Sequence, residues 1–373
     1  MMQDVNGDGD ATDPGEHTHK PVAAAIQQVM AAFANAPIKN PNGSTGITVH
    51  VDTGQFGGGN LIPHFYELDF NATSGGDRRD PAIGVGGGQV VLTWEDDRDR
   101  NGIGQIYLQT ISLAGLLQGD EVVVNSVGDG QQLNPDLAVN GAGRMVVVWE
   151  DDQDGNGKYQ ILGVGFGGNL NQTLSLQEPN PVNSVSAGQQ RRPAVAMDAG
   201  GNFVVVWEDD QDGNGKYQIL ARGFDVNGVP RFSLEEPNAV NSVSAGQQLR
   251  PDVAMDAAGN FVIVWEDDQD GNGRYEILAR GFNANGTPRF SLQEPTPVNT
   301  VSGGQQLKPA VAMDGAGNFV VVWEDDQDGN GKYQILGRGF NSNGNPRFSL
   351  EEPNAVNSVA AGQQRQAAVA MDP

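Results

Sequence analysis

Carboxylates and side-chain amides stand at alternate positions in short glycine-rich loops along this chain. In one loop, Asp210, Asp212 and Asn214 are followed by Gly215. Carboxylates at positions one and three, an amide at position five and a glycine that permits a sharp turn form the opening of a calcium-binding loop. Oxygen donors without His or Cys favour Ca²⁺ over zinc or copper. The loops therefore predict structural Ca²⁺ sites.

The same pattern occurs in five repeated loops and once near the N-terminus. The predicted metal ligands are, in chain order, Asp4, Asn6, Asp8, Asp10, Asp97, Asp99, Asn101, Asp152, Asp154, Asn156, Asp210, Asp212, Asn214, Asp268, Asp270, Asn272, Asp326, Asp328 and Asn330. Arg98 and Arg100 are expected to weaken the first repeated site, because they bring positive charge into the loop.

One calcium ligand is missing from these loops. A helix-loop-helix calcium site needs a glutamate at position 12, where this chain has Ala221 after Asp210 and Gly15 after Asp4. The remaining ligands must come from elsewhere, with Glu208 and Asp209 as candidates. The alternative is that Asp-Gly-Asn-Gly only makes a good turn. Clustered carboxylates without a cation would repel one another, which favours calcium.

Composition narrows the class of protein. The 373 residues carry a net charge of −25 and no cysteine. Such an acidic surface repels phosphates and anionic lipid, so we expect neither nucleic acid nor membrane insertion. Disulfides and thiolate metal sites are excluded. The N-terminus does not read as a signal peptide, and we expect the sequence to be a fragment of a longer protein.

A repeat organises most of the chain. Tryptophan stands at positions 94, 149, 207, 265 and 323, at spacings of 55, 58, 58 and 58 residues. Each unit offers four short β-type runs separated by Gly, Asn, Asp and Pro turns. The second run, Phe203 to Glu208 in one unit, is continuously apolar except at its end, which predicts a strand covered on both faces.

A four-stranded unit packed between two neighbours is a propeller blade. We therefore predict an all-β fold, a β-propeller of about five four-stranded blades or part of a larger ring, preceded by a small α/β segment. A two-sheet sandwich would show alternation along the second run, and a β-solenoid would have shorter repeats. The expected boundaries are an N-terminal segment 1–78 and a repeat domain 79–373, with blades at 79–134, 135–192, 193–250, 251–308 and 309–366.

One first strand is surplus to five blades. Residues 367–373 repeat the start of a unit without its continuation. Either the natural chain continues into further blades, or the strand pairs elsewhere. Our hypothesis is that Ala367 to Met371 adds to an exposed sheet edge on a neighbouring molecule.

The repeat resembles a known type of protein. The motif from Pro193 through Trp207, the acidic loop, the run Ala221 to Phe224 and the later Val-Asn-Ser and Gly-Gln-Gln resemble repeats of large bacterial surface and adhesin-like proteins. Its first half is similar to the start of an NHL-type propeller blade. The resemblance covers residues 79–373. It implies a repeat architecture and specifies no activity.

The N-terminal segment follows different rules. Pro21 opens an expected helix whose apolar face is formed by Val22, Ile26, Val29, Met30 and Phe33, and a strand is expected over 46–51. The loop at 4–10 resembles the calcium loop of dockerins. The segment 1–78 resembles the N-terminal part of secreted bacterial metallopeptidase-like proteins, whose His-Glu-x-x-His zinc signature is absent here. The histidines are His17, His19, His50 and His64.

An active site is a single set of different residues that occurs once in a protein. Repeat units that are nearly identical carry the same residues in every copy, which argues against such a site. The repeat region also has no histidine. We therefore expect no enzyme but an extracellular, calcium-stabilised module for adhesion or scaffolding at the cell surface. Its expected partners are a protein or glycan at a cell surface, or copies of itself. The alternatives are a self-assembling subunit of an extracellular filament or surface layer, and an accessory region of a secreted hydrolase, since paired carboxylates also suit glycosidase chemistry.

Overall fold

The structure is a computed structural model. It describes residues 48–52, 65–69, 77–113, 115–235, 239–293, 296–301, 303–351, 355–357 and 362–371. The expected helix after Pro21, the N-terminal calcium loop and the histidines His17, His19 and His64 lie outside the described residues. The expected strand over 46–51 overlaps β1 (Thr48–Asp52), which pairs with β2 (Phe65–Asp69).

Five four-stranded antiparallel sheets follow in the described part of the chain, each with its strands in chain order. Blade 1 contains β3 (Arg78–Gly86), β4 (Gln89–Asp96), β5 (Gln105–Ser112) and β6 (Leu117–Val123). Blade 2 contains β7 (Gln132–Val139), β8 (Met145–Asp151), β9 (Gln160–Phe166) and β10 (Gln172–Leu176). Blade 3 contains β11 (Gln190–Met197), β12 (Phe203–Asp209), β13 (Gln218–Phe224) and β14 (Pro230–Leu234). Blade 4 contains β15 (Gln248–Met255), β16 (Phe261–Asp267), β17 (Glu276–Phe282) and β18 (Pro288–Leu292). Blade 5 contains β19 (Gln306–Met313), β20 (Phe319–Asp325), β21 (Gln334–Phe340) and β22 (Pro346–Leu350).

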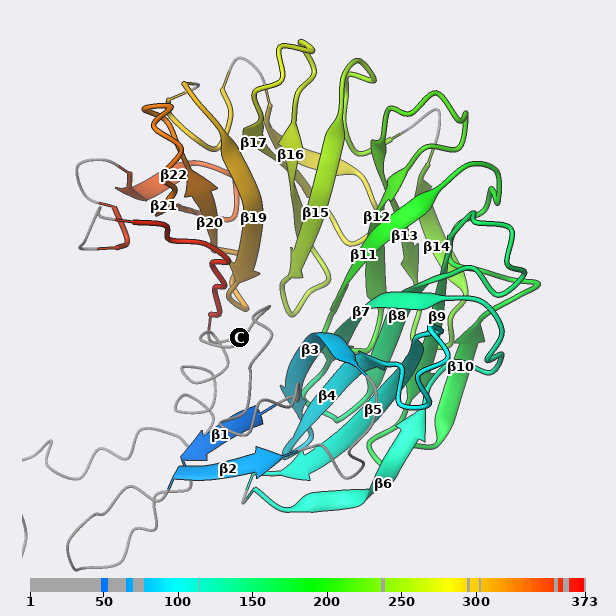
Figure 1. Cartoon of the computed structure of the whole chain (residues 1–373). Helices are drawn as coiled ribbons and strands as arrows, with labels where there is room; N and C mark the ends of the chain where they lie inside the picture. The colour runs from blue at the N-terminus through cyan, green and yellow to red at the C-terminus, as the bar shows by residue number, and fades with distance from the viewer. Residues whose placement is uncertain are drawn as a thin grey trace, which may run out of the picture.

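The blades are arranged side by side around a common centre (Figure 1). Their first strands β3, β7, β11, β15 and β19 lie innermost, and each of the first four contacts the first strand of the blade that follows it. All regular elements in the described ranges are strands. The predicted all-β propeller of five four-stranded blades is therefore confirmed. No helix among the described residues has the length and apolar character needed to cross a membrane.

The second strands form the core because both of their faces are covered. In β12, Val204 and Val206 pack in one apolar cluster with Phe261 of blade 4. The alternate residue Val205 packs in another cluster with Val146 of blade 2. Successive side chains point to opposite faces of a sheet, so a continuously apolar strand is what a blade between two neighbours requires.

Candidate functional site

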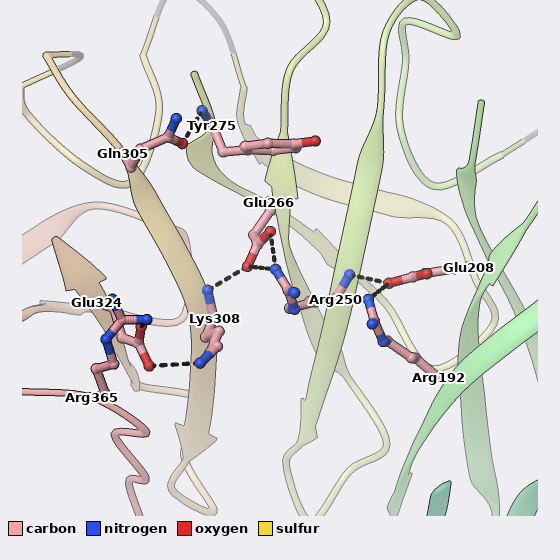
Figure 2. Close-up of polar contacts among 9 residues, drawn as sticks. All are labelled: Arg192, Glu208, Arg250, Glu266, Tyr275, Gln305, Lys308, Glu324 and Arg365. Carbon is pink, nitrogen blue, oxygen red and sulfur yellow. Dashed lines mark hydrogen bonds and ion pairs between the residues drawn. The ribbon is translucent and has the colours of Figure 1, made fainter. Parts of the chain in front are cut away.

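A chain of charged side chains crosses from blade to blade, with its basic residues on the first strands and its glutamates on the second strands (Figure 2). The backbone N–H of Arg250 in β15 donates to Glu208 Oε1 in blade 3 at 2.6 Å. The guanidinium of Arg250 donates to both carboxylate oxygens of Glu266 in its own blade, at 2.9 and 2.8 Å. One residue therefore joins the carboxylates of two consecutive blades.

The same arrangement recurs at the neighbouring blades. Arg192 donates its backbone N–H to Glu150 at 2.7 Å and its Nη1 to Glu208 at 3.1 Å. Lys308 donates its backbone N–H to Glu266 and its Nζ to Glu324. We call Glu150, Glu208, Glu266, Glu324 and the residues Arg192, Arg250 and Lys308 the hub relay.

Backbone geometry aims these N–H groups across the blade boundary. Arg192, Arg250 and Lys308 have positive φ angles of 48, 48 and 50° and precede a proline, at an irregularity in the pairing of the first and second strands. Left-handed backbone is uncommon for residues other than glycine, so its recurrence at one position indicates a constraint. The relay glutamates are almost fully buried, and burial raises the pKa of Glu150 and Glu266. The hydrogen bonds that Glu150 and Glu266 accept lower the pKa of these carboxyl groups and so oppose the effect of burial. Because the donors of several of these bonds lie in the next blade, the relay links each blade to the one that follows.

Blade 1 departs from this arrangement. Its hub glutamate, Glu95, forms an ion pair with Arg79 at 3.7 Å. The other blades have a tyrosine at the position of Gly104, for example Tyr159. A Cβ at Gly104 would lie 2.8 Å from Glu95 Oε1, so the Glu95 side chain packs directly against this glycine. Burial raises the pKa of Glu95 to about 7, while Arg79 lowers it.

Two further carboxylates break the repeat on the inner strands. Asp136 in β7 and Asp252 in β15 stand directly after the strand proline, where the other three blades carry Ala82, Ala194 and Ala310. Both aspartates are half-buried. They lie in blades 2 and 4, with blade 3 between them.

Backbone amides orient these two aspartates. Asp136 Oδ2 accepts the N–H of Val195 in the next inner strand at 2.7 Å. Asp252 Oδ2 accepts the N–H of Val311 at 2.8 Å, and its Oδ1 accepts the N–H of Val253 at 2.9 Å. Both carboxyl groups are thereby fixed against the edge of the following blade's first strand.

Desolvation dominates the electrostatics of this pair. It raises the pKa of Asp136 to about 6 in spite of the two amide hydrogen bonds. It raises the pKa of Asp252 to about 7, to which the negative charge of Asp136 contributes. A carboxyl group whose pKa is raised toward neutrality can donate or accept a proton near neutral pH.

The predicted calcium ligands in the repeated loops hold the loops' own turns. Asp152 accepts the N–H of Gly157 with both carboxylate oxygens, at 3.0 and 3.1 Å. Asp154 accepts the N–H and the side-chain amide of Asn156. The loops beginning at Asp97, Asp210, Asp268 and Asp326 repeat these contacts.

The two residues expected to complete the calcium shell are engaged elsewhere. Glu208 belongs to the hub relay, and Asp209 accepts the indole N–H of Trp207 at 3.0 Å and the N–H of Gln211 at 2.8 Å. Within the described ranges, no three residues among His, Cys, Asp and Glu gather in a group that could hold a metal ion. Calcium binding stays a prediction, and Asp4, Asn6, Asp8 and Asp10 lie outside the described residues.

Sequence reasoning missed Asp136 and Asp252 because it emphasised what the repeats share. The signal was present in two alanine-to-aspartate differences at one register position, which a comparison of units reveals. The difference between Gly104 and the tyrosines of the other blades marks Glu95 in the same way. The five units therefore differ from one another at positions 104, 136 and 252, although the sequence analysis treats them as equivalent.

Comparison with known proteins supports the fold. No protein-family model and no curated protein matches the chain. A Dyadobacter fermentans protein of unknown function is similar in structure, with a TM-score of 0.50 and 13% identity over 82% of this chain and 86% of that chain. A thermostable family-43 glycoside hydrolase gives 0.43 and 12% over 78% and 98%. A Penicillium chrysogenum α-L-arabinanase complexed with arabinobiose gives 0.45 and 13% over 69% and 80%.

These comparisons correct two expectations. The prediction of a non-catalytic adhesion or scaffolding module, and with it the prediction that the chain is not an enzyme, is corrected: the similar structures named here with an activity are glycoside hydrolases, so the comparisons contradict the non-catalytic interpretation, although they assign no activity to this chain. Of the alternatives given in the sequence analysis, the accessory region of a secreted hydrolase agrees best with these similar structures. The resemblances to adhesins, NHL repeats, dockerins and metallopeptidases find no support in these comparisons. At identities of 16% or less, the likeness establishes the propeller fold alone, so activity must be argued from the chain's own residues.

Proposed function

We propose that this propeller is a glycoside hydrolase in which Asp252 and Asp136 are the acid and the base. The observation that carries the proposal is their shared departure from the repeat. Both replace an alanine on an inner strand, and both have a raised pKa, about 7 for Asp252 and about 6 for Asp136. Perturbed carboxyl groups at non-repeating positions are the pattern of an active site rather than of a repeat's scaffold.

Hydrolysis of a glycosidic bond needs one protonated and one ionised carboxyl group. We assign the acid to Asp252, because burial and the charge of Asp136 both raise its pKa, and the base to Asp136. It would donate its proton to the glycosidic oxygen as the bond to the anomeric carbon breaks. Asp136 would accept a proton from the water whose oxygen forms the new bond to that carbon. The N–H groups of Val195 and Val311 hold the two carboxyl groups in place and keep their side chains from rotating.

A structural role is the competing explanation. An unpaired strand edge exposes N–H groups, and an inward-pointing carboxylate can cap them. Val195 and Val311 are capped in this way. Capping across the blade boundary, however, needs only one acceptor, and the single side-chain oxygen of asparagine can accept the N–H of Val195 or Val311, although Asp252→Asn gives up the second bond, from Val253. Asparagine therefore separates the two explanations, because it cannot exchange a proton.

The test is an assay for reducing sugar released from a panel of polysaccharides. Arabinan belongs in the panel because it is the polymer named in the class of several similar structures. Asp252→Asn and Asp136→Asn should each lower kcat by 10²-fold or more, the range expected for loss of a general acid or base, with the melting temperature kept. Asp256→Asn, in the turn directly after β15, is the matched control and should keep full activity. Equal activity of all three variants would contradict the assignment, and no product from any polysaccharide would contradict the proposed function.

A further inference from the structure

One arginine on an inner strand departs from the repeat and has no partner of opposite charge. Arg191 in β11 is partly exposed, and it stands at the position where blades 2, 4 and 5 carry Leu133, Leu249 and Leu307. In the described part of the chain, its guanidinium forms no hydrogen bond and no ion pair. Arg79, at the same position in blade 1, forms an ion pair with Glu95 at 3.7 Å. Arg191 therefore keeps its N–H groups available for a ligand.

The carboxylates nearest to Arg191 are already engaged. Glu208, opposite Arg191 in the pairing of β11 with β12, accepts a hydrogen bond from Nη1 of Arg192. Glu150 of blade 2 accepts the N–H of Arg192 and the side-chain amide of Asn134, both at 2.7 Å. Burial raises the pKa of Glu150, and the charge of Arg191 is among the effects that lower it. Arg191 thus lies within electrostatic reach of a carboxylate that other donors hold.

Two tyrosines flank the guanidinium of Arg191. Its Cζ lies 5.7 Å from the ring centroid of Tyr159, which is the distance of a cation–π contact. Burial raises the pKa of Tyr217, and the charge of Arg191 lowers it. Both tyrosines are partly exposed, and neither hydroxyl forms a hydrogen bond within the described ranges. A sugar presents apolar C–H faces and hydroxyl edges, which an amphipathic aromatic side chain matches.

Arg191 lies on the strand between the two proposed catalytic aspartates. Asp136 of blade 2 accepts the N–H of Val195, which is four residues after Arg191 in β11. Strands rise about 3.3 Å per residue, so these two positions lie about 13 Å apart or less along β11. Asp252 belongs to β15, which contacts β11 on the side away from β7 (Figure 1). A glycan of a few sugar units bound at the aspartates therefore extends to Arg191.

We propose that Arg191 is the specificity-determining residue of this site and binds the carboxylate of a uronic acid unit in an acidic glycan. A guanidinium presents two parallel N–H groups that match the two oxygens of a carboxylate, and this charge-assisted pair is stronger than a neutral hydrogen bond. Tyr159 orients the guanidinium, and Tyr217 packs against the sugar ring. Arg191 thereby sets the substrate class of the hydrolase proposed above, on which this inference rests.

The charge of the whole chain makes this assignment specific. A net charge of −25 repels polyanions in general. An acidic glycan that binds in spite of this repulsion needs a local cation that is free to pair with it. Arg192 and Arg250 do not meet this need, because Glu208 and Glu266 already hold them in the hub relay.

The alternative role for Arg191 is to offset the buried charge of Glu150. The repeat itself supplies the variant that separates the two roles, because leucine occupies this position in three other blades and Arg191→Leu should therefore fold. Arg191→Gln is the second variant, since it removes the charge and keeps a polar side chain. Arg231→Leu is the matched control, because Arg231 is exposed on β14, the fourth strand of the same blade.

Affinity gel electrophoresis, with polysaccharide in the gel, measures binding to polygalacturonate, glucuronoxylan and alginate, each compared with its own methyl ester. Esterification removes the charge and leaves the sugars unchanged. We expect the unaltered chain to bind at least one acidic polysaccharide more tightly than its ester by about tenfold or more, as one charge-assisted pair supplies. Arg191→Leu and Arg191→Gln should remove this preference, whereas Arg231→Leu should keep it.

The outcomes separate this inference from the proposed hydrolase. Equal binding of acid and ester by the unaltered chain, or a preference that survives in the Arg191 variants, would overturn the inference even if a neutral polysaccharide is hydrolysed. A preference lost equally in Arg231→Leu would also overturn it, because overall charge would then be the cause. A preference lost only in the Arg191 variants, without sugar released from any polysaccharide, would support the binding site and contradict the proposed hydrolase.

Discussion

Arg250 of blade 4 donates its backbone N–H to the carboxylate of Glu208 in blade 3, and the same contact recurs at the boundaries on either side. The Arg250 N–H reaches Glu208 Oε1 at 2.6 Å because its backbone has a φ of 48°. Such a conformation costs on the order of 1–2 kcal/mol for a residue with a side chain. The buried, charge-assisted hydrogen bond offsets this cost. The repeat therefore keeps a strained residue at each boundary where it fixes the position of one blade relative to the next.

Removal of one relay carboxylate should destabilise the fold. Glu208→Ala leaves the N–H of Arg250 without its acceptor, and a buried unsatisfied donor costs about 1–3 kcal/mol. Urea denaturation measures the loss of unfolding free energy. Asp120→Ala, at an exposed position of β6, is the control and should change it by less than about 0.5 kcal/mol. An equal effect of the two substitutions would show that the relay contributes nothing to stability.

Stability should fall as the pH rises from about 4 to about 7. The pKa values of Glu95 and Asp252 are raised to about 7, and those of Asp136, Asp209 and Asp325 to about 6. In the unfolded chain these groups ionise near pH 4, so the native state binds more protons across this window. Stability decreases with pH wherever the native state holds the additional protons.

Thermal melts at intervals between pH 4 and 8 measure this dependence. The melting temperature should be highest near the acidic end of the window and decline through pH 7. Asp252→Asn removes one of the groups responsible, so its melting curve should depend less steeply on pH than that of the unaltered chain. A melting temperature that rises between pH 5 and 7 would contradict the expected direction.

Calcium should stabilise the chain if the acidic loops bind it in the folded state. A site present at 100 times its dissociation constant adds about 2.7 kcal/mol to the unfolding free energy. Several loops acting together should raise the melting temperature by more than about ten degrees relative to a chelated sample. Combined substitution of Asp154, Asp212, Asp270 and Asp328 by Asn should remove most of the shift. Equal melting with calcium and chelator would leave these loops as turns, held by the contacts of Asp152 and its equivalents.

The local sequence pattern predicted the strands of each blade, but it did not predict the polar contacts between neighbouring blades. The apolar run from Phe203 to Trp207 requires two covered faces, and a blade packed between two neighbours provides them for a repeated unit of four short β-type runs, so this part followed from the sequence. The role of Glu208 did not, because its partner Arg250 is 42 residues away and depends on a left-handed backbone that no propensity indicates. Asp136 and Asp252 were overlooked for a different reason. Their meaning arises from the difference between units, whereas periodicity emphasises what the units have in common.

Phe290 and Phe348 offer a direct measurement of what one blade contributes to the next. Both occupy the middle of the fourth strand in the sequence Pro-Arg-Phe-Ser-Leu, and only Phe290 stacks on a following blade. Phe290→Ala should lower the unfolding free energy by about 2–4 kcal/mol, because it removes a packed ring and leaves a cavity against Phe319. Phe348→Ala should change it by less than about 1 kcal/mol, because much of its ring already faces solvent. Urea denaturation of both variants gives the comparison. A large loss at Phe348 would mean that its ring is covered in solution, which would contradict this expectation.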